Sequence, residues 1–114
     1  MTSTATIAKT PVAPYYAVIF TSQRTDVDQG YDQMAQRMIA LAFQVPGFLG
    51  VESVCSADRL GITVSYWRSE DAIRRWKTHS AHTIGQEAGR NMWYSDYVLR
   101  VAKIERAYGM ITDY

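Results

Sequence analysis

The run from Tyr15 to Thr21 is apolar at almost every position, and it constrains the fold more than any other part of the chain. Side chains alternate between the two faces of a strand, so both faces of this strand are apolar. The faces carry Tyr16, Val18 and Phe20 on one side and Tyr15, Ala17 and Ile19 on the other. Such a strand needs cover on both faces. We therefore expect other parts of the chain to cover one face and a partner to cover the second.

A helix and a hairpin are expected to follow this strand. Apolar residues recur at helical spacing from Tyr31 to Ala42, and this helix is expected to end before Pro46-Gly47. Residues 48–55 and 60–67 alternate in the manner of strands, and the turn 56–59 joins them. The middle of the chain therefore predicts an α-helix followed by an antiparallel hairpin.

The second half of the chain predicts another helix and a last strand. Ser69 is a good N-cap for a helix that carries Ala72, Ile73 and Trp76 inward. A break is expected near residues 78–80, before a further helical stretch at 82–91. Residues 97–108 have a pattern that fits a strand or a helix. We interpret them as a strand because this completes the order strand, helix, strand, strand, helix, strand.

That order predicts the fold class and the assembly. It is the order of an α+β domain of the ferredoxin-like βαββαβ kind, in which helices cover only one face of the sheet. The first strand is apolar on its other face as well. A twofold homodimer with the two sheets facing one another is the simplest symmetric way to cover it.

Composition limits the classes of function. The 114 residues form one domain, expected over residues 15–114 and preceded by a flexible N-terminal arm, residues 1–14. The 12 Lys and Arg against 11 Asp and Glu offer no basic footprint, so nucleic acid is not an expected partner. We expect no membrane partner, because no segment approaches the roughly 18 apolar residues of a span and the first residues lack a secretory signal. Cys55, the only cysteine, is expected to be small and buried in a cytoplasmic protein.

The aromatic residues gather in one part of the chain. All three tryptophans and both histidines lie between residues 67 and 93. One face of the strand 60–67 pairs the small polar Thr63 and Ser65 with Trp67. This pattern suits the wall of a cavity for a flat ligand, and the alternative is a tryptophan that closes the core.

These segments resemble the antibiotic biosynthesis monooxygenase family. The resemblance rests on residues 17–22, 46–53 and 62–67, followed by Trp76, His79, His82, Gly89-Arg90, Trp93-Tyr94, Tyr97 and residues 101–106. It implies a dimeric α+β barrel with a pocket between helices and sheet in each chain. It also implies one of three kinds of protein. Some members oxygenate polycyclic phenols without metal or flavin, some bind and degrade haem, and many have no established activity.

The resemblance implies a role for Trp67. Members of both catalytic kinds place an indole at this strand end, against the flat ligand, and Trp67 matches it. Haem-degrading members also carry an Asn on the first strand, which has none here, and a helical His that ligates iron. His79 or His82 could supply that ligand, so haem stays possible as a cofactor, although the expected cofactor is none.

The remaining candidates each have a plainer alternative. Substrate-binding candidates are Trp67, Tyr66, Ser65, Thr63, Trp76 and Arg90, against core packing for the aromatics and a salt bridge for Arg90. Catalytic candidates are Trp67, His79 and His82, against surface histidines. Dimer-interface candidates are Trp93, Tyr94 and Tyr97, which could also close a pocket mouth. Two histidines alone do not make a metal site, so none is expected.

The leading hypothesis is a cofactor-independent monooxygenase acting on a planar aromatic substrate of the phenol or hydroquinone kind. Such a substrate would itself be the reductant, and no Gly-rich dinucleotide or phosphate loop contradicts this. The first alternative is a haem-binding or haem-degrading monooxygenase. The second is a non-catalytic dimer that binds a small ligand or serves a stress response.

Overall fold

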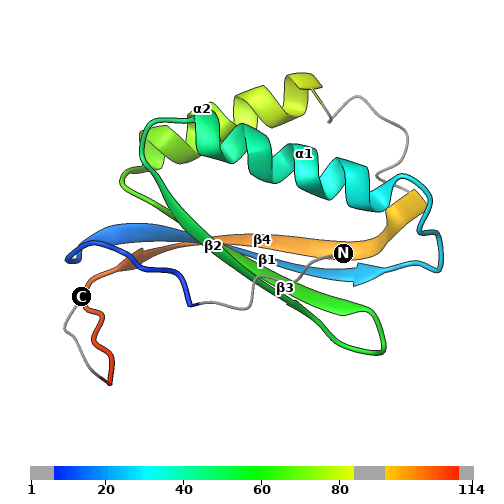
Figure 1. Cartoon of the computed structure of the whole chain (residues 1–114), viewed down its shortest axis with the longest axis horizontal. Helices are drawn as coiled ribbons and strands as arrows, with labels where there is room; N and C mark the ends of the chain where they lie inside the picture. Colours follow the sequence, from blue (N-terminus) through cyan, green and yellow to red (C-terminus); the bar gives the residue numbers. More distant parts are fainter. Residues whose placement is uncertain (1–6, 84–91, 111–114) are drawn as a thin grey trace.

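The computed structural model of the chain describes residues 7–83 and 92–110, except for the side chains of residues 81–83. In chain order its elements are β1 (Tyr15–Arg24), α1 (Tyr31–Gln44), β2 (Phe48–Cys55), β3 (Leu60–Trp67), α2 (Glu70–Thr83) and β4 (Tyr94–Ile104). The strands form one sheet in the order β2-β3-β1-β4, and every neighbouring pair is antiparallel. Both helices lie on one face of the sheet (Figure 1).

This arrangement confirms the ferredoxin-like α+β fold, including the hairpin and the last strand. The last strand runs from Tyr94 to Ile104 instead of over residues 97–108, because residues from Tyr94 onward pair with the end of β1 and Ile104 pairs with Tyr15, the first residue of β1. No helix in the described part of the chain is long and apolar enough to cross a membrane.

The second helix corrects one expectation. The predicted break near residues 78–80 is wrong, because α2 continues to Thr83. The hydroxyl of Thr78 donates to the carbonyl of Arg74 at 3.0 Å, and that of Ser80 donates to the carbonyl of Lys77 at 3.0 Å. Both polar side chains thus bond back onto the preceding turn and leave the helix intact. The expected N-cap is present, since the backbone N–H of Ala72 donates to Oγ of Ser69 at 3.2 Å.

Two clusters of side chains fill the space between sheet and helices. The Trp67 cluster consists of Val18, Ala42, Val45, Trp67 and Ala72, with Tyr16, Phe48, Ile73 and Trp76 packed against it. The Trp93 cluster consists of Met34 and Trp93, with Tyr31, Met38, Leu41 and Tyr94 around them. Because α1 contributes to both clusters, it holds the beginning of α2 and the beginning of β4 to the same layer.

The turn between α1 and β2 brings the two helices together. Gly47 has a φ of 100°, a left-handed conformation that glycine adopts most easily. Its carbonyl accepts the backbone N–H of Arg68 at 2.8 Å, and a Cβ placed on it would lie 2.9 Å from Cβ of Ala72. This turn therefore lies directly against the first turn of α2.

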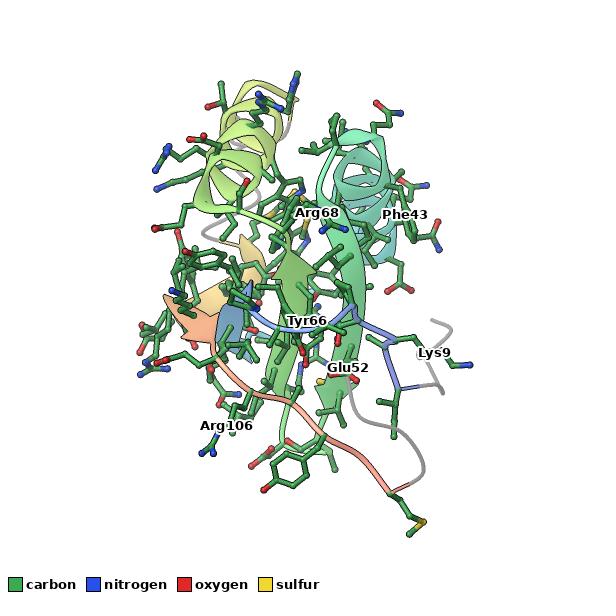
Figure 2. The ribbon with its side chains drawn as sticks, turned by 90° about the vertical axis from the view of Figure 1, so that its left-hand side faces the viewer. Lys9, Phe43, Glu52, Tyr66, Arg68 and Arg106 are labelled. Atoms are coloured by element: carbon green, nitrogen blue, oxygen red, sulfur yellow. The ribbon has the colours of Figure 1, made fainter. Side chains whose placement is uncertain are left out.

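The other face of the sheet, which we call the open face, is covered by neither of the two helices in the described part of the chain (Figure 1). Part of the segment expected as a flexible arm lies on it. The backbone N–H of Ala8 donates to Glu52 at 2.9 Å, and the hydroxyl of Thr10 donates to the phenol oxygen of Tyr15 at 2.9 Å. Figure 2 shows this arm, marked by Lys9, beside Glu52 and Tyr66. The arm covers one end of the open face and leaves the other end exposed.

Cys55 corrects a second expectation. We expected a small buried residue, and the structure exposes it. It is the last residue of β2, beside the hairpin turn, and its thiol donates to the carbonyl of Ser56 at 3.6 Å. The alternation of β2 predicts which face Cys55 occupies but not how far along the strand the helical cover extends.

Candidate functional site

Trp67 lies at the centre of the helix-covered side of the sheet. It is the last residue of β3, paired with Tyr16 of β1 and Phe48 of β2. Its side chain is 0% exposed. The Phe48 ring approaches edge-on with centroids 5.1 Å apart, and the Trp76 ring lies tilted at 5.5 Å. The indole is therefore enclosed by other side chains, and a ligand could reach it only if one of these rings moved.

The two small polar residues beside Trp67 are engaged within the sheet. The indole N–H of Trp67 donates to Oγ of Ser65 at 2.9 Å. The hydroxyls of Thr63 and Ser53 share a hydrogen bond of 2.8 Å between neighbouring strands. Ser65 thus satisfies a buried donor that would otherwise be costly to bury. All three predicted residues of this face, Thr63, Ser65 and Trp67, lie on the helix-covered side as the alternation requires.

Tyr66 lies on the open face, away from the other substrate-binding candidates. Its phenol donates to Glu52 at 2.7 Å, and its ring meets that of Tyr15 edge-on at 5.9 Å. Burial raises the pKa of the Tyr66 phenol well above its ordinary value, and the hydrogen bond to the Glu52 carboxylate raises this pKa further. The structure therefore does not bring Tyr66 together with Ser65 and Trp67.

Trp76 joins the two helices above the Trp67 cluster. It is half-buried on α2, and its indole N–H donates to the backbone carbonyl of Met38 in α1 at 3.4 Å. Its ring is also the one that covers Trp67 from the helix side. Trp76 thus packs against Trp67 from α2 and ties this helix to α1.

Of the candidate polar residues on and after α2, the structure describes only the side chain of His79. His79 is exposed, and with Asp71, Arg74, Arg75 and Thr78 it lines an open depression on the surface of α2. The side chain of His82 and all of Arg90 lie outside the described residues. Within the described residues, no group of three or more His, Cys, Asp or Glu side chains could hold a metal ion.

Of the three residues expected at a dimer interface, Trp93 and Tyr94 belong to the Trp93 cluster, and the Tyr97 ring packs against that of Tyr94. Trp93 is 5% exposed, and its indole N–H donates to the backbone carbonyl of Gln29 at 2.9 Å. Tyr94 is half-buried beside Phe20, with ring centroids 5.5 Å apart. Tyr97 is 41% exposed and lies tilted against the same phenylalanine at 5.6 Å. Of the three, Tyr97 offers the most surface to a partner.

Sequence reasoning missed the polar centre of this cluster, formed by Arg24 and Tyr31. The Arg24 guanidinium lies 3.4 Å from the centroid of the Tyr31 ring, a close cation–π contact. The Tyr94 phenol donates to the Tyr31 phenol at 3.4 Å. Burial raises the pKa of Tyr94, and this hydrogen bond raises it further. Arg24 also donates to Asp28 at 3.0 Å, and no pattern in the sequence indicated these contacts, because Arg24 ends a strand and Asp28 lies in the following loop.

The sequence profile of a family described as antibiotic biosynthesis monooxygenase matches residues 14–88. The chain belongs to the antibiotic biosynthesis monooxygenase family. It is 55% identical over 100 residues to the uncharacterized Bacillus subtilis protein YqjZ, covering 88% of each chain. It is 32% identical over 92 residues to the jasmonate monooxygenase of Pyricularia oryzae, covering 78% of this chain and 43% of the fungal protein.

Two solved structures share the fold of this family member at low sequence identity. SnoaB from Streptomyces nogalater, a cofactor-independent oxygenase, has a TM-score of 0.68 at 12% identity, covering 83% of this chain and 97% of SnoaB. A dimeric ferredoxin-like protein from Thermobifida fusca has a TM-score of 0.63 at 12% identity, covering 87% of this chain and 100% of the other. At this level of identity the similarity is one of fold.

Proposed function

We propose that this family member is a monooxygenase that uses no bound metal or flavin and oxidises an electron-rich, planar phenol or hydroquinone. The observation that carries the proposal is membership of the antibiotic biosynthesis monooxygenase family over residues 14–88. The shared fold of SnoaB, a cofactor-independent oxygenase, supports the absence of a cofactor. The aromatic Trp67 cluster between sheet and helices supports a flat, apolar substrate.

The reaction balances without a cofactor because the substrate supplies the electrons. A phenolate transfers an electron to O₂, and the ring carbon then forms a bond to oxygen. Cleavage of the O–O bond leaves one oxygen atom on the ring as a quinone carbonyl and releases the other as water. A phenol and O₂ thus give a quinone and one water. The protein has to take the phenolic proton and to exclude bulk water from the reacting pair.

Particular residues receive roles in this proposal. Trp67 would be the wall on which the substrate stacks, with Ser65 and Thr63 beside it, once Trp76 moves aside from the indole. His79 or His82 would accept the phenolic proton, since a neutral imidazole is suited to this near pH 7. Arg90 would hold a polar group of the substrate.

We also propose that the working form is a homodimer in the cytoplasm. The open face exposes apolar side chains, among them Val54, Ile62 and Val98, that one chain leaves uncovered. The Thermobifida fusca protein of the same fold is described as dimeric. The single cysteine of the sequence favours a reducing compartment.

Oxygen uptake by chelator-treated protein tests the function. We expect uptake with polycyclic phenols and hydroquinones above the rate of autoxidation, and one atom of ¹⁸O₂ in each quinone formed. Trp67→Phe preserves an aromatic ring in the core and is expected to lower kcat/KM about tenfold or more. Val54→Ala on the open face is the matched control. It should keep the rate constants of the parent dimer when the protein concentration in the assay is well above the dimer dissociation constant of the variant.

Three outcomes would overturn or redirect the proposal. Uptake no faster than autoxidation across the panel would rule out oxygenase activity on these substrates. A Soret band that saturates at one haem per chain, and fades with ascorbate in air, would make haem the substrate or cofactor. Oxidation of jasmonate, included because of the fungal relative's name, with none of the phenols would replace the aromatic substrate class.

A further inference from the structure

The strand β4 differs from its neighbours on the helix-covered side of the sheet, and the substrate role that we give to it rests on the proposed function. Strand pairing places Val101 opposite Val18 and Leu99 opposite Phe20. Residues that pair directly point to the same side of a sheet, so Val101 and Leu99 lie on the side of the Trp67 cluster, to which Val18 belongs. Val18 is 4% exposed, whereas Val101 is 54% and Leu99 is 49% exposed. The cover that buries β1 on this side therefore does not extend over β4.

Two more side chains of β4 complete this surface, which we call the β4 strip. The strip consists of every second residue of the strand, Tyr97, Leu99, Val101 and Lys103. Tyr97 is 41% exposed, and Lys103 is exposed as well. Side chains two residues apart on a strand are about 7 Å apart, so the strip extends over about 20 Å. It has an apolar middle, with a phenol at one end and a cation at the other.

Three aromatic rings form the Tyr97 end of the strip. The Phe20 ring contacts those of Tyr94 and Tyr97, with centroids 5.5 Å and 5.6 Å apart, and the Tyr94 and Tyr97 centroids are 5.9 Å apart. Aromatic rings prefer to pack edge-on or offset against one another. A flat ring that rests on Leu99 would therefore find aromatic partners at one of its edges.

Lys103 forms the other end of the strip. It is exposed and makes no ion pair with another described residue. A lysine ammonium is a compact charge on a flexible stem, so it can turn toward an anionic group beside it. The strip is therefore complementary in shape and charge to a ligand with a flat apolar body and an anionic group at one end.

We propose that the β4 strip is the place where the substrate first binds, and that this substrate is an aromatic hydroxy acid. Its rings would rest on Leu99 and Val101 with one edge toward Tyr97, and its carboxylate would pair with Lys103. The apolar part of the strip consists of only three side chains, whereas a protein partner contacts about 20–30 residues on each side of a stable interface. A small flat molecule therefore fits the strip better than a protein does.

The strip lies beside Trp67 and outside the packed core. Lys103 pairs with Tyr16 of β1, and Tyr16 pairs with Trp67 of β3. Lys103 and Trp67 are therefore two strand spacings apart, about 10 Å. Because Trp67 is 0% exposed, a substrate has to bind at an accessible place before one of the rings around Trp67 moves. The strip provides such a place, so its side chains should set the affinity for the substrate, measured as Kd and KM.

Two probes that differ by one carboxylate test the role of Lys103 in the full chain. The probes are β-hydroxynaphthoate and β-naphthol, titrated into the protein under argon in a calorimeter. We expect the hydroxynaphthoate to bind at least about threefold more tightly than the naphthol, as an ion pair at an exposed position allows. Lys103→Gln should remove this preference and leave the Kd of β-naphthol unaltered. Lys9→Gln removes the same charge from an exposed position of the arm and should change neither Kd.

A charge in the apolar middle of the strip gives a second test. Leu99→Glu should raise the Kd of both probes about tenfold, because a ring that covers the new carboxylate would remove its water. Ile39→Glu makes the same change on α1, at a side chain that is 39% exposed, and should leave both Kd values unaltered. Circular dichroism checks that both variants fold. In the parent protein, nuclear Overhauser effects should connect the ring protons of the probe with the methyl groups of Leu99 and Val101.

The outcomes separate the strip from the proposed function. The strip is overturned if neither probe binds, if Lys103→Gln keeps the preference for the carboxylate, or if Overhauser effects reach Trp67 but neither Leu99 nor Val101. Binding on the strip without oxygen uptake across the panel of phenols and hydroxy acids would overturn the oxygenase and leave the strip as a ligand site. Oxygen uptake whose KM for β-hydroxynaphthoate is unaltered by Lys103→Gln would overturn the strip and leave the oxygenase standing.

Discussion

The apolar residues on the two faces of the sheet differ in burial, most clearly at Trp67 and Val54. On the helix-covered side, Trp67 is fully enclosed and even its N–H has a partner in Ser65. On the open face, Val54 keeps 67% of its surface exposed. The strands that carry these residues are hydrogen-bonded neighbours, so the difference arises only from what lies above each face. The comparison teaches that the chain itself completes the core around Trp67, whereas the apolar Val54, Ile62 and Val98 of the open face keep a large exposed surface.

The largest effect expected from this comparison is that of Trp67→Ala. Removing the indole leaves a cavity among Phe48, Trp76 and Val18 and leaves Ser65 without its donor. We expect a loss of about 3–5 kcal/mol in the free energy of unfolding. Urea denaturation followed by circular dichroism measures it, with Trp67→Phe as a milder control. A loss below about 1 kcal/mol would mean that the Trp67 cluster is not a packed core and that the two faces differ less than described.

Trp93→Phe probes the other end of the helix-covered face, with a smaller effect. The substitution removes the N–H that donates to the carbonyl of Gln29 and keeps an aromatic ring against Met34. We expect a loss of about 1–2 kcal/mol, since a hydrogen bond contributes about 1 kcal/mol and the smaller ring packs less well. Thermal unfolding measures it. An unchanged unfolding midpoint would show that this end of the face does not depend on Trp93.

The two phenols with raised pKa values allow a pH comparison of the faces. Burial raises the pKa of Tyr66 on the open face and of Tyr94 on the covered face above the ordinary 10.0. Because the folded chain holds these protons more tightly than the unfolded chain, the associated stability is present below about pH 10 and is lost as the pH rises further.

Absorbance at 295 nm measures this ionisation in the folded protein. Tyr66→Phe and Tyr94→Phe should each leave the titration below about pH 11 unchanged. A decrease in the titrating absorbance near pH 10 in either variant would place that phenol in water, and would contradict the burial described for its face.

The smallest effect is expected for Val54→Ala on the open face. An exposed side chain loses little when it is truncated, so the free energy of unfolding of the monomer should change by less than about 0.5 kcal/mol. Denaturation at a concentration where ultracentrifugation finds monomer measures this value. A loss above about 1 kcal/mol in the monomer would show that the open face is already covered within one chain.

Most of the fold could be predicted from the sequence because strand alternation and helical spacing are local properties. They place Thr63, Ser65 and Trp67 together and put Tyr66 on the other face. They do not report how far a helix extends over a strand, which is why Cys55 was expected to be buried and is exposed. The break expected in α2 failed for a different reason, since the hydroxyls of Thr78 and Ser80 bond within the helix.

The candidate site was less predictable than the fold because its contacts join distant segments. The stacking of Arg24 on Tyr31 depends on the path of the loop between β1 and α1, which no periodic pattern encodes. The hydrogen bond from Tyr94 to Tyr31 joins residues 63 positions apart in sequence. The enclosure of Trp67 depends on Trp76 of a helix whose position is set by packing. The residue types in the sequence could suggest candidate site residues. Only the three-dimensional structure shows which side chains contact each of them.

The turn at Gly47 has a consequence for how this sequence can vary. Two independent conditions apply at this position, the left-handed φ of 100° and the 2.9 Å that would separate a Cβ from Cβ of Ala72. Satisfying one of them does not relieve the other, so Ala is not expected at this position, and Asn, which adopts a left-handed φ more easily than Ala, is expected only where residue 72 is glycine. Homologous sequences should therefore show covariation between a turn and the first turn of a helix 25 residues later (72 − 47). An alignment in which position 47 varies freely while residue 72 stays alanine would contradict this constraint.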